Sequence, residues 1–359
     1  MRILFLVEDL ASGGAERVVS LLANQFSKID DITVATLRKD EVCYSLNAKV
    51  KYVHIKQKND LFIIRSVHRV MSTVKEIREA KPDVVIAFDT FCNIYAVFCR
   101  LFINTKIIIS ERNDPNNYPN NKYMRYIRNI AYRFADGIVF QTKGARNYFR
   151  LGKTVKTVII PNPINESFLP DIECSAKEKV IVNVCRLNEQ KNLKLFVDII
   201  EQVIAKYTDY SAVIYGEGPE RPSLIKYIEN RGLSNKISLP GHCMNVKEEL
   251  EKCMIYLCTS DYEGISNSIL EAMTLGLPVV ATDCPIGGTK MMIRSGKNGF
   301  LYKVGQSGEA VSIIERLIED DKLRLAIGNN ARKIRDHWSI EKISKMWYEF
   351  IDDVVDRGN

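Results

Sequence analysis

The chain has 359 residues, of which 46% are hydrophobic and 26% charged, with a net charge of +7. One hydrophobic core stops growing at roughly 250–300 residues, so the length predicts two domains, and the composition is that of an ordinary globular protein. Residues 1–170 hold 26 Lys and Arg against 16 Asp and Glu, whereas the remainder holds 25 against 28. The basic first half indicates either an anionic partner (phosphate groups, anionic lipid or nucleic acid) or only a solvated basic surface.

Cysteine spacing and hydropathy argue against a zinc cluster and a membrane span. The nine cysteines are scattered singly and form neither a C-x-x-C pair nor a Cys/His cluster, so free thiols in a reducing cytosol are expected. Residues 1–7 are typical of a first strand rather than of a signal peptide. The apolar stretch 84–109 is interrupted by Asp89, Arg100 and Lys106. We therefore expect a cytoplasmic protein, which can still bind the inner face of the cytoplasmic membrane.

In the first half, short runs rich in Val and Ile alternate with helical patterns. The continuous apolar runs favour parallel strands covered on both faces, and parallel strands need helical crossovers between them. We predict strands at 3–7, 32–37, 50–55, 83–88, 106–110, 137–141 and 157–160, and helices at 14–27, 62–80 and 121–135.

A linker is indicated by the prolines of Ile160-Pro161-Asn162-Pro163 and by the polar stretch that follows, to Lys179. The alternation then resumes and ends in an amphipathic helix at 340–355. We predict strands at 180–185, 212–215, 237–239, 254–258 and 278–281, and helices at 192–206, 220–231, 245–252, 267–275 and 309–319.

This order predicts an α/β fold with two parallel-sheet, Rossmann-like domains, residues 1–165 and 166–339. Ligands of open α/β sheets bind beyond the carboxyl ends of the strands. Candidate functional residues are therefore sought in the loops that follow the predicted strands.

The first such loop, Ser12-Gly13-Gly14-Ala15-Glu16-Arg17, follows the first strand and opens a helix. Glycines let the backbone approach a ligand closely, and the N-terminus of a helix favours an anion. The pattern is neither G-x-G-x-x-G nor a P-loop, which weakens a dinucleotide-binding interpretation. A tight turn without a ligand is the alternative.

Two cations, Arg186 and Lys191, lie where the first strand of the second domain gives way to a helix, in the run Cys185-Arg186-Leu187-Asn188-Glu189-Gln190-Lys191-Asn192. Cations in such a place can hold a diphosphate and stabilise its charge as it leaves. A pair of surface cations near a helix start is the alternative.

Two carboxylates, Glu263 and Glu271, lie eight residues apart across a loop-to-helix junction. Ser266 or Asn267 can cap this helix, which places Glu271 near its first turn. We expect both carboxylates and the free N–H groups between them to face one crevice, where a carboxylate can accept hydrogen bonds from a sugar or ribose. The alternative is a well-capped helix with acidic residues near its positive end.

This last run resembles the E-x7-E element of the large retaining glycosyltransferase family 4, which has the GT-B fold. Further motifs are similar to the family's in order and spacing, from residue 3 to about residue 350. They are the glycine loop 13–17, Pro161-Asn162-Pro163-Ile164, Arg186-Leu187 with Gln190-Lys191-Asn192, Gly216-Glu217-Gly218-Pro219, and 276–282. The run Ser110-Glu111-Arg112-Asn113-Asp114-Pro115 resembles the subset that builds bacterial surface polysaccharides on lipid carriers.

The resemblance implies a role for each matching residue. Gly13 and Gly14 approach the donor phosphates or sugar, Arg186 and Lys191 bind the diphosphate, and Glu271 holds the nucleotide ribose. Arg186, Lys191 and Glu263 are the predicted catalytic residues, and no metal or other cofactor is expected because Arg and Lys replace it. The transferred sugar and phosphate are held by Glu263 and the amides of Gly264, Ile265, Ser266 and Asn267.

The resemblance also implies that the tail, residues 340–359, crosses back onto the first domain and that the acceptor lies in a cleft between the domains. Many family members place a histidine after a first-domain strand, near the reacting sugar. None of His54, His68, His242 and His337 is suitably placed here. The corresponding residues Glu111, Arg112 and Asn113 are instead candidates for acceptor binding.

Two first-domain helices mix aromatic and basic residues, and the second carries Lys122, Arg125 and Arg133 on one predicted face. This face can bind an acceptor diphosphate or an anionic membrane. A half-buried helix whose tyrosines belong to the core is the alternative. Single-stranded nucleic acid also suits basic and aromatic residues, but no nucleic-acid-binding motif is present, so no nucleic acid partner is expected.

We therefore predict a retaining glycosyltransferase that moves a hexose or N-acetylhexosamine from a nucleotide sugar to a lipid-linked or oligosaccharide acceptor. UDP is the nucleotide expected from the family. A nucleotide-sugar epimerase or phosphorylase of the same fold is an alternative, as is a two-lobed sugar-binding protein, which would need export. A dehydrogenase would need G-x-G-x-x-G with an acid about 20 residues further on, and neither half supplies it.

Overall fold

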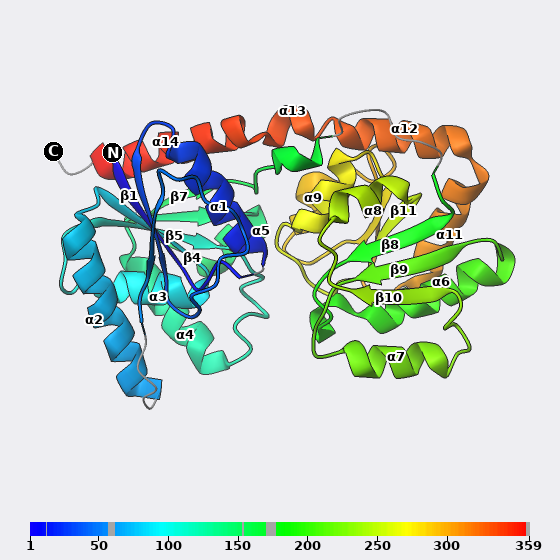
Figure 1. The fold of residues 1–359 in the computed structure, drawn as a ribbon, viewed down its shortest axis with the longest axis horizontal. Coiled ribbons are helices and arrows are strands. Elements are labelled where there is room, and N and C mark those ends of the chain that lie inside the picture. The colour runs from blue at the N-terminus through cyan, green and yellow to red at the C-terminus, as the bar shows by residue number, and fades with distance from the viewer. Residues whose placement is uncertain (12, 57–61, 153, 170–176, 357–359) are drawn as a thin grey trace. The chain divides into compact units, whose positions relative to one another are not determined.

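The computed structural model describes residues 1–11, 13–56, 62–152, 154–169 and 177–356, so Ser12 of the glycine loop lies outside the described residues. The chain forms two compact units: Met1–Pro163 with Trp338–Asn359, and Ile164–His337 (Figure 1). The first division falls two residues before the predicted boundary. Asn162, just before the division, is bound within the first unit, where its Oδ1 accepts from Nη1 of Arg112 at 2.9 Å and from Nε2 of Gln141 at 2.6 Å.

The first unit contains a seven-stranded parallel sheet in the order β3-β2-β1-β4-β5-β6-β7. Strands β1 and β4 are central, and Ile3 of β1 pairs with Ile32 on one side and Val84 on the other. Because both faces are covered, the strands read as continuous apolar runs, as predicted. The strands are β1 (Arg2–Val7), β2 (Asp31–Thr36), β3 (Lys51–His54), β4 (Val84–Phe88), β5 (Lys106–Glu111), β6 (Gly137–Phe140) and β7 (Lys156–Ile159).

Helices cover both faces of this sheet. The C-terminal helix α14 (Ile340–Asp356) packs beside α1 (Gly14–Phe26) and buries Trp347 against Phe88, with ring centroids 5.6 Å apart. The tail of the chain therefore returns to the first unit. The other helices of this unit are α2 (Phe62–Ala80), α3 (Thr90–Cys99), α4 (Lys122–Ala131) and α5 (Lys143–Phe149).

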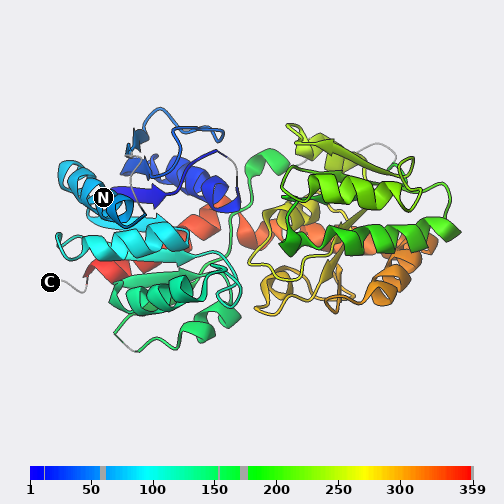
Figure 2. The ribbon, with the colours of Figure 1, turned by 90° about the horizontal axis from the view of Figure 1, so that it is seen from below.

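Helices α2, α3 and α4 lie side by side, as Figure 2 shows. Helix α3 was not predicted, because eight of its ten residues are buried and it therefore shows no amphipathic period. A span through a membrane would need a longer or more apolar helix than any in the described part of the chain.

The second unit contains a six-stranded parallel sheet in the order β10-β9-β8-β11-β12-β13. Its central strands β8 and β11 are neighbours, with Ile255 paired to Ile181. The strands are β8 (Val180–Val184), β9 (Ser211–Tyr215), β10 (Ile237–Gly241), β11 (Ile255–Cys258), β12 (Val279–Thr282) and β13 (Phe300–Tyr302).

Helices α6 (Leu193–Lys206) and α11 (Ser307–Glu319) pack together on one face of this sheet, with α7 (Arg221–Glu229) beside α6. Helix α9 (Asn267–Thr274) contacts β11 and β12, and α12 (Asp321–Arg332) contacts α9. Three further short helices are α8 (Val246–Lys252), α10 (Gly288–Met292) and α13 (Arg335–Trp338). The prediction lacked β13, α10, α12 and α13; β13 and α10 span only three and five residues, too few for a period.

Candidate functional site

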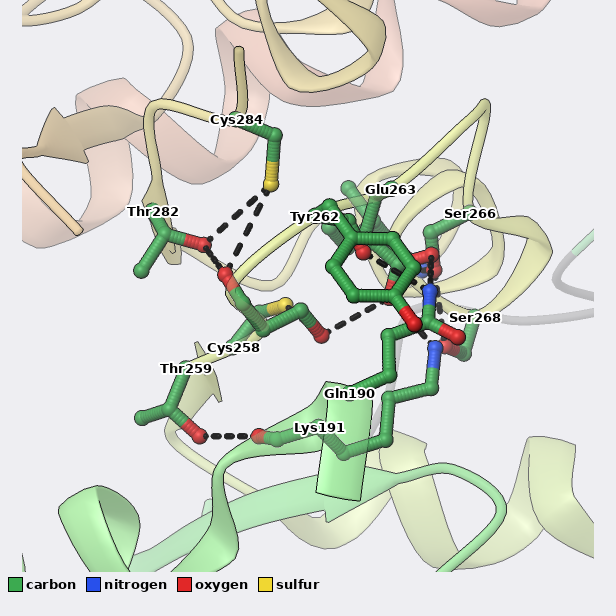
Figure 3. A network of polar contacts seen from close by, with 12 residues as sticks. Gln190, Lys191, Cys258, Thr259, Tyr262, Glu263, Ser266, Ser268, Thr282 and Cys284 are labelled. Carbon is green, nitrogen blue, oxygen red and sulfur yellow. Dashed lines mark hydrogen bonds and ion pairs between the residues drawn. The ribbon is translucent and has the colours of Figure 1, made fainter. Parts of the chain in front are cut away.

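Lys191 and Glu263 form an ion pair at the carboxyl edge of the second sheet (Figure 3). Lys191 ends a short 3-10 turn, Glu189–Lys191, after β8, and Glu263 lies in the loop after β11. The Glu263 Oε1 that accepts from Lys191 also accepts from the Ser260 hydroxyl at 2.7 Å. Their side chains are 17% and 8% exposed. The sequence predicted each residue as part of the site but did not predict that they bind each other.

Hydrogen bonds to backbone carbonyls tie the two loops together. The amide of Asp261 donates to the Gln190 carbonyl at 2.9 Å, and the Thr259 hydroxyl donates to the Lys191 carbonyl at 2.9 Å. Gln190 Nε2 donates to the Tyr262 carbonyl at 2.7 Å, also visible in Figure 3. These contacts hold together the two loops that carry Lys191 and Glu263.

The electrostatics of the pair keep Lys191 cationic. Burial lowers the pKa of Lys191, but the adjacent Glu263 carboxylate outweighs burial and leaves the pKa above its ordinary value. An ammonium group has three N–H donors. Lys191 can therefore keep its bond to Glu263 and still offer donors to an anion.

Arg186 differs from Lys191 because its side chain is exposed, and within the described part of the chain its guanidinium has no hydrogen-bond or ion-pair partner. The neighbouring Leu187 is fully buried and its amide donates to the Glu217 carbonyl at 2.9 Å. A Cβ on Gly218 would collide with the Leu187 carbonyl, so the two loop backbones touch there. The loop is thus anchored at Leu187, directly after Arg186.

Ser266 is the N-cap of α9, and its hydroxyl accepts from the Ile269 amide at 3.5 Å. The helix begins at Asn267, so the expected cap is Ser266, and Glu271 lies just after the first turn, near where it was expected. Glu271 is only 6% exposed. The first N–H groups of any α-helix lack partners within that helix, so this N-terminus suits an anion. Gly264 and Ile265 lie in the loop just before it.

In the first unit, the glycine loop is held by hydrogen bonds to Tyr44, a residue that the sequence analysis did not predict as part of the site. The Gly13 amide donates to the Tyr44 hydroxyl at 3.2 Å, and that hydroxyl donates to the Gly13 carbonyl at 3.1 Å. A Cβ on Gly13 would overlap the Glu16 carboxylate. The close approach at Gly13 is therefore explained by Glu16, and Gly14 begins α1.

Glu111 ends β5, Arg112 and Asn113 follow it, and the structure separates their roles. Glu111 Oε1 accepts from the amides of Arg112 and Asn113 at 3.0 and 3.1 Å, and Oε2 accepts from the Tyr132 hydroxyl at 2.8 Å. Glu111 is 1% exposed and both its oxygens are used inside the protein. Glu111 therefore stabilises the turn after β5. The side chain of Asn113 is half-buried.

Arg112 is buried, and its guanidinium lies over Phe88 and Trp347, 4.6 and 5.7 Å from the ring centroids. Its Nη1 donates to Asn162, but Nε and Nη2 have no partner among the described residues. Burial lowers the pKa of Arg112 to about 9, against the opposing effect of the Asp89 and Glu111 carboxylates. The free Nε and Nη2 form the side of a guanidinium that binds paired oxygen atoms.

The predicted basic face of α4 needs correction. The helix ends at Ala131, so Arg133 lies in the following 3-10 turn, Tyr132–Phe134, rather than on a common helical face with Lys122 and Arg125. Arg125 Nη1 donates to the Pro119 and Asn120 carbonyls at 2.9 and 3.1 Å. Lys122 and Arg133 are exposed. Tyr132 belongs to the core, as the alternative interpretation held, whereas Tyr123 and Tyr126 are exposed.

Comparison with known proteins identifies the family to which the chain belongs. Residues 12–168 match the family model described as Glycosyltransferase Family 4, and residues 166–334 match the one described as Glycosyl transferases group 1. The chain belongs to the family 4 glycosyltransferases and has their GT-B fold of two Rossmann-like domains. The resemblance read from the motifs is confirmed.

Relatives of the chain build bacterial glycans. A Campylobacter jejuni enzyme is 26% identical over 99% of both chains, and it is named GalNAc-alpha-(1->4)-GalNAc-alpha-(1->3)-diNAcBac-PP-undecaprenol alpha-1,4-N-acetyl-D-galactosaminyltransferase. An amylovoran biosynthesis glycosyltransferase of Erwinia amylovora is 23% identical, covering 98% of this chain and 99% of its own. The structure of Anabaena HepE in complex with UDP-glucose is 21% identical with a TM-score of 0.81, covering 98% of this chain and all of that chain.

Proposed function

We propose that this enzyme transfers a hexose or N-acetylhexosamine, with retention of configuration, from a UDP-sugar to a lipid-linked saccharide during the synthesis of a surface glycan. The observation that carries the proposal is the cationic edge of the second sheet: the exposed Arg186 shares the loop after β8 with Lys191, and Lys191 pairs with Glu263, which lies just before the N-terminus of α9. The Campylobacter relative is named for a diphospho-undecaprenol acceptor, and HepE was solved with UDP-glucose. Both support the choice of substrates.

In this proposal the cations act on the leaving diphosphate. As the glycosidic bond breaks, negative charge develops on the phosphate, and preorganised donors stabilise that charge without reorganisation. Arg186 is free to form paired hydrogen bonds with phosphate oxygens, and Lys191 is already positioned by Glu263. The two side chains thereby supply the positive charge that a metal ion would otherwise give.

The carboxylates have separate tasks. Glu263, held by Lys191 and Ser260, accepts hydrogen bonds from hydroxyls of the transferred sugar. Glu271 holds the ribose, while the amides of Gly264, Ile265, Ser266 and Asn267 bind sugar and phosphate before and at the start of α9.

The test is an assay of the purified enzyme with UDP-glucose, UDP-galactose, UDP-GlcNAc and UDP-GalNAc, alone and with glycoside acceptors. Release of UDP together with an α-linked product from an α-linked donor is the expected result. Conversion of one UDP-sugar into its epimer without an acceptor would support an epimerase instead. A strict requirement for inorganic phosphate would support a phosphorylase.

We also propose that the first unit binds an anionic membrane surface through α2, α3 and α4, which lie side by side (Figure 2). Lys122 and Arg133 are exposed beside many exposed apolar side chains on these helices and the turns after them. Aromatic and aliphatic side chains beside cations are typical of proteins that lie at the headgroup boundary. The exposed apolar residues are Ile64, Val67, Met71, Phe98, Leu101, Phe102, Tyr123, Tyr126, Ile127, Ile130 and Phe134.

Sedimentation with lipid vesicles tests this membrane proposal. We expect the protein to bind phosphatidylglycerol-containing vesicles and not phosphatidylcholine alone. Each cation near an anionic surface contributes about 1 kcal/mol, so reversing Lys122 and Arg133 to Glu should weaken binding by roughly tenfold or more. Reversal of Lys345, exposed on α14 at the other face of the sheet, should have little effect. Equal binding by both variants would contradict the proposal.

A further inference from the structure

Asp89 occupies an unusual place at the carboxyl end of β4. It is the N-cap residue of α3, yet its carboxyl accepts no hydrogen bond from the helix amides, which is the ordinary role of Asp in that position. Among the described residues the carboxyl has neither a hydrogen-bond nor an ion-pair partner. An Asp that neither caps its helix nor pairs with a cation needs another explanation.

The backbone of Asp89 is strained. Its φ is 74° and its ψ is 149°, at the border of a region that is essentially reserved for glycine. Glycine would adopt this conformation without a steric cost. The presence of Asp at a position that suits Gly indicates that the carboxyl itself is needed there, since backbone geometry alone would favour the smaller residue.

The charged groups around Asp89 come from the ends of the neighbouring strands β1 and β5 and from the first turn of α1. Burial and then the Glu16, Glu8 and Glu111 carboxylates raise the pKa of Asp89 well above its usual range, and Arg112 opposes them. Arg112 is within electrostatic reach but does not bond to Asp89, and it leaves Nε and Nη2 without partners although its side chain is 8% exposed. The Asp89 carboxyl and the Nε and Nη2 of Arg112 could bond to each other, yet neither has a hydrogen-bond partner among the described residues.

We propose that Asp89 accepts a hydrogen bond from a hydroxyl group of the acceptor sugar, with Arg112 as the positioning residue beside it. The surrounding carboxylates disfavour an anion at this edge of the sheet, whereas a sugar offers hydroxyl groups that can donate hydrogen bonds to a carboxyl oxygen. The assignment rests on the proposed function, because it presumes glycosyl transfer to a saccharide. It adds to the acceptor site a residue directly after β4 that neither the motifs nor the missing histidine indicated.

The experiment compares transfer with donor hydrolysis in the full-length protein. The acceptor probes are p-nitrophenyl α- and β-glycosides of glucose, galactose, GlcNAc and GalNAc, used with the UDP-sugar that wild type hydrolyses fastest. For Asp89→Asn we expect kcat/KM for the glycoside to fall by about 10- to 100-fold, with donor hydrolysis unchanged. Asp83→Asn, at the opposite end of β4, is the matched control and should behave as wild type.

Two further readouts separate a binding role from a structural one. Asp89→Gly relieves the strained backbone, so it should unfold at a higher temperature than wild type while still losing transfer. In wild type, kcat/KM for the glycoside should rise with pH as Asp89 ionises, whereas Asp89→Asn should lack that rise.

The outcomes that contradict the inference are distinct from those that contradict the enzyme's activity. Wild-type transfer kinetics in Asp89→Asn, or equal losses of transfer and hydrolysis, would overturn the role of Asp89. Donor hydrolysis by wild type without transfer to any of the glycosides would also count against a sugar hydroxyl at this carboxyl. Absence of donor hydrolysis in wild type would instead overturn the proposed function.

Discussion

Lys191 and Glu263 lie 72 residues apart in the chain and form one ion pair in the loops that follow the neighbouring strands β8 and β11. Both side chains are largely buried, so the pair affects stability as well as the site. Removing one partner of such a pair leaves a buried charge unpaired and typically costs about 3–5 kcal/mol.

The first prediction concerns the stability of this pair. Glu263→Gln should lower the free energy of unfolding by about 3 kcal/mol, because Lys191 loses its counter-ion inside the protein. Replacing both residues, as Lys191→Met with Glu263→Gln, should cost less than the sum of the single changes. Urea unfolding followed by circular dichroism measures all three variants, and additive losses would show that the two residues do not interact.

The pair also has a pH dependence of known sign. The folded-state pKa of Lys191 is raised, so its contribution to stability is complete below the ordinary lysine pKa and is lost as pH rises through the folded value. The difference in unfolding free energy between wild type and Lys191→Met should therefore stay constant through neutral pH and shrink only in strongly alkaline solution. A difference that shrinks between pH 6 and 9 would refute this assignment of charge.

Glu271→Ala should weaken UDP binding more than it disturbs folding. Hydrogen bonds between the Glu271 carboxylate and ribose hydroxyls are each worth roughly 1.5–3 kcal/mol, so the dissociation constant should rise by about tenfold or more. Isothermal titration calorimetry measures the affinity, with Glu229→Ala at the exposed end of α7 as the control. Unchanged affinity in a folded Glu271→Ala protein would remove Glu271 from the site.

Activity should survive chelation, because Arg186 and Lys191 are proposed to supply the positive charge at the diphosphate. The measurement is UDP release in excess EDTA, followed by addition of magnesium or manganese. Activity that disappears with EDTA and returns with either metal would show that the cations are not sufficient.

The contact between the loops at 187 and 218 gives a further prediction. In Gly218→Ala the new Cβ collides with the Leu187 carbonyl, so the loop that carries Arg186 must move and kcat should fall. The control is Gly308→Ala in α11, where a Cβ meets nothing within 4 Å and helix propensity favours Ala by roughly 0.5–1 kcal/mol. Steady-state kinetics and thermal unfolding are measured for both variants. Equal kcat values for Gly218→Ala and Gly308→Ala would show that the contact between the two loops does not affect catalysis.

The sequence was sufficient for the parallel strands, because strands buried on both faces leave continuous apolar runs such as β1 and β4. It was not sufficient for α3, whose burial on nearly all sides erases the helical period, or for the end of α4 before Arg133. Charge type and strand-end position indicated Lys191 and Glu263. Their mutual contact depends on the order of strands in the sheet, which local patterns do not encode.

Other site features depend on contacts between distant segments. The sequence made Glu111 a candidate for acceptor binding, whereas its bonds to Tyr132 and to the following amides are visible only in the folded turn. The two hydrogen bonds between Gly13 and Tyr44 join residues that are 31 positions apart in the chain. Asp89 could have been suspected as an Asp at a strand end, but its strained backbone and open carboxyl are properties of the structure alone.

The kinetics of Arg186→Ala test the account most directly. Arg186 is exposed and has no protein partner among the described residues, so its removal should leave the unfolding free energy unchanged. If it stabilises charge that develops on the leaving phosphate, kcat at saturating donor should fall by about 10²–10³, and Arg186→Lys should restore only part of it. A folded Arg186→Ala enzyme with a raised KM for the donor and an unchanged kcat would contradict the account, because Arg186 would then bind the donor without acting on the transition state.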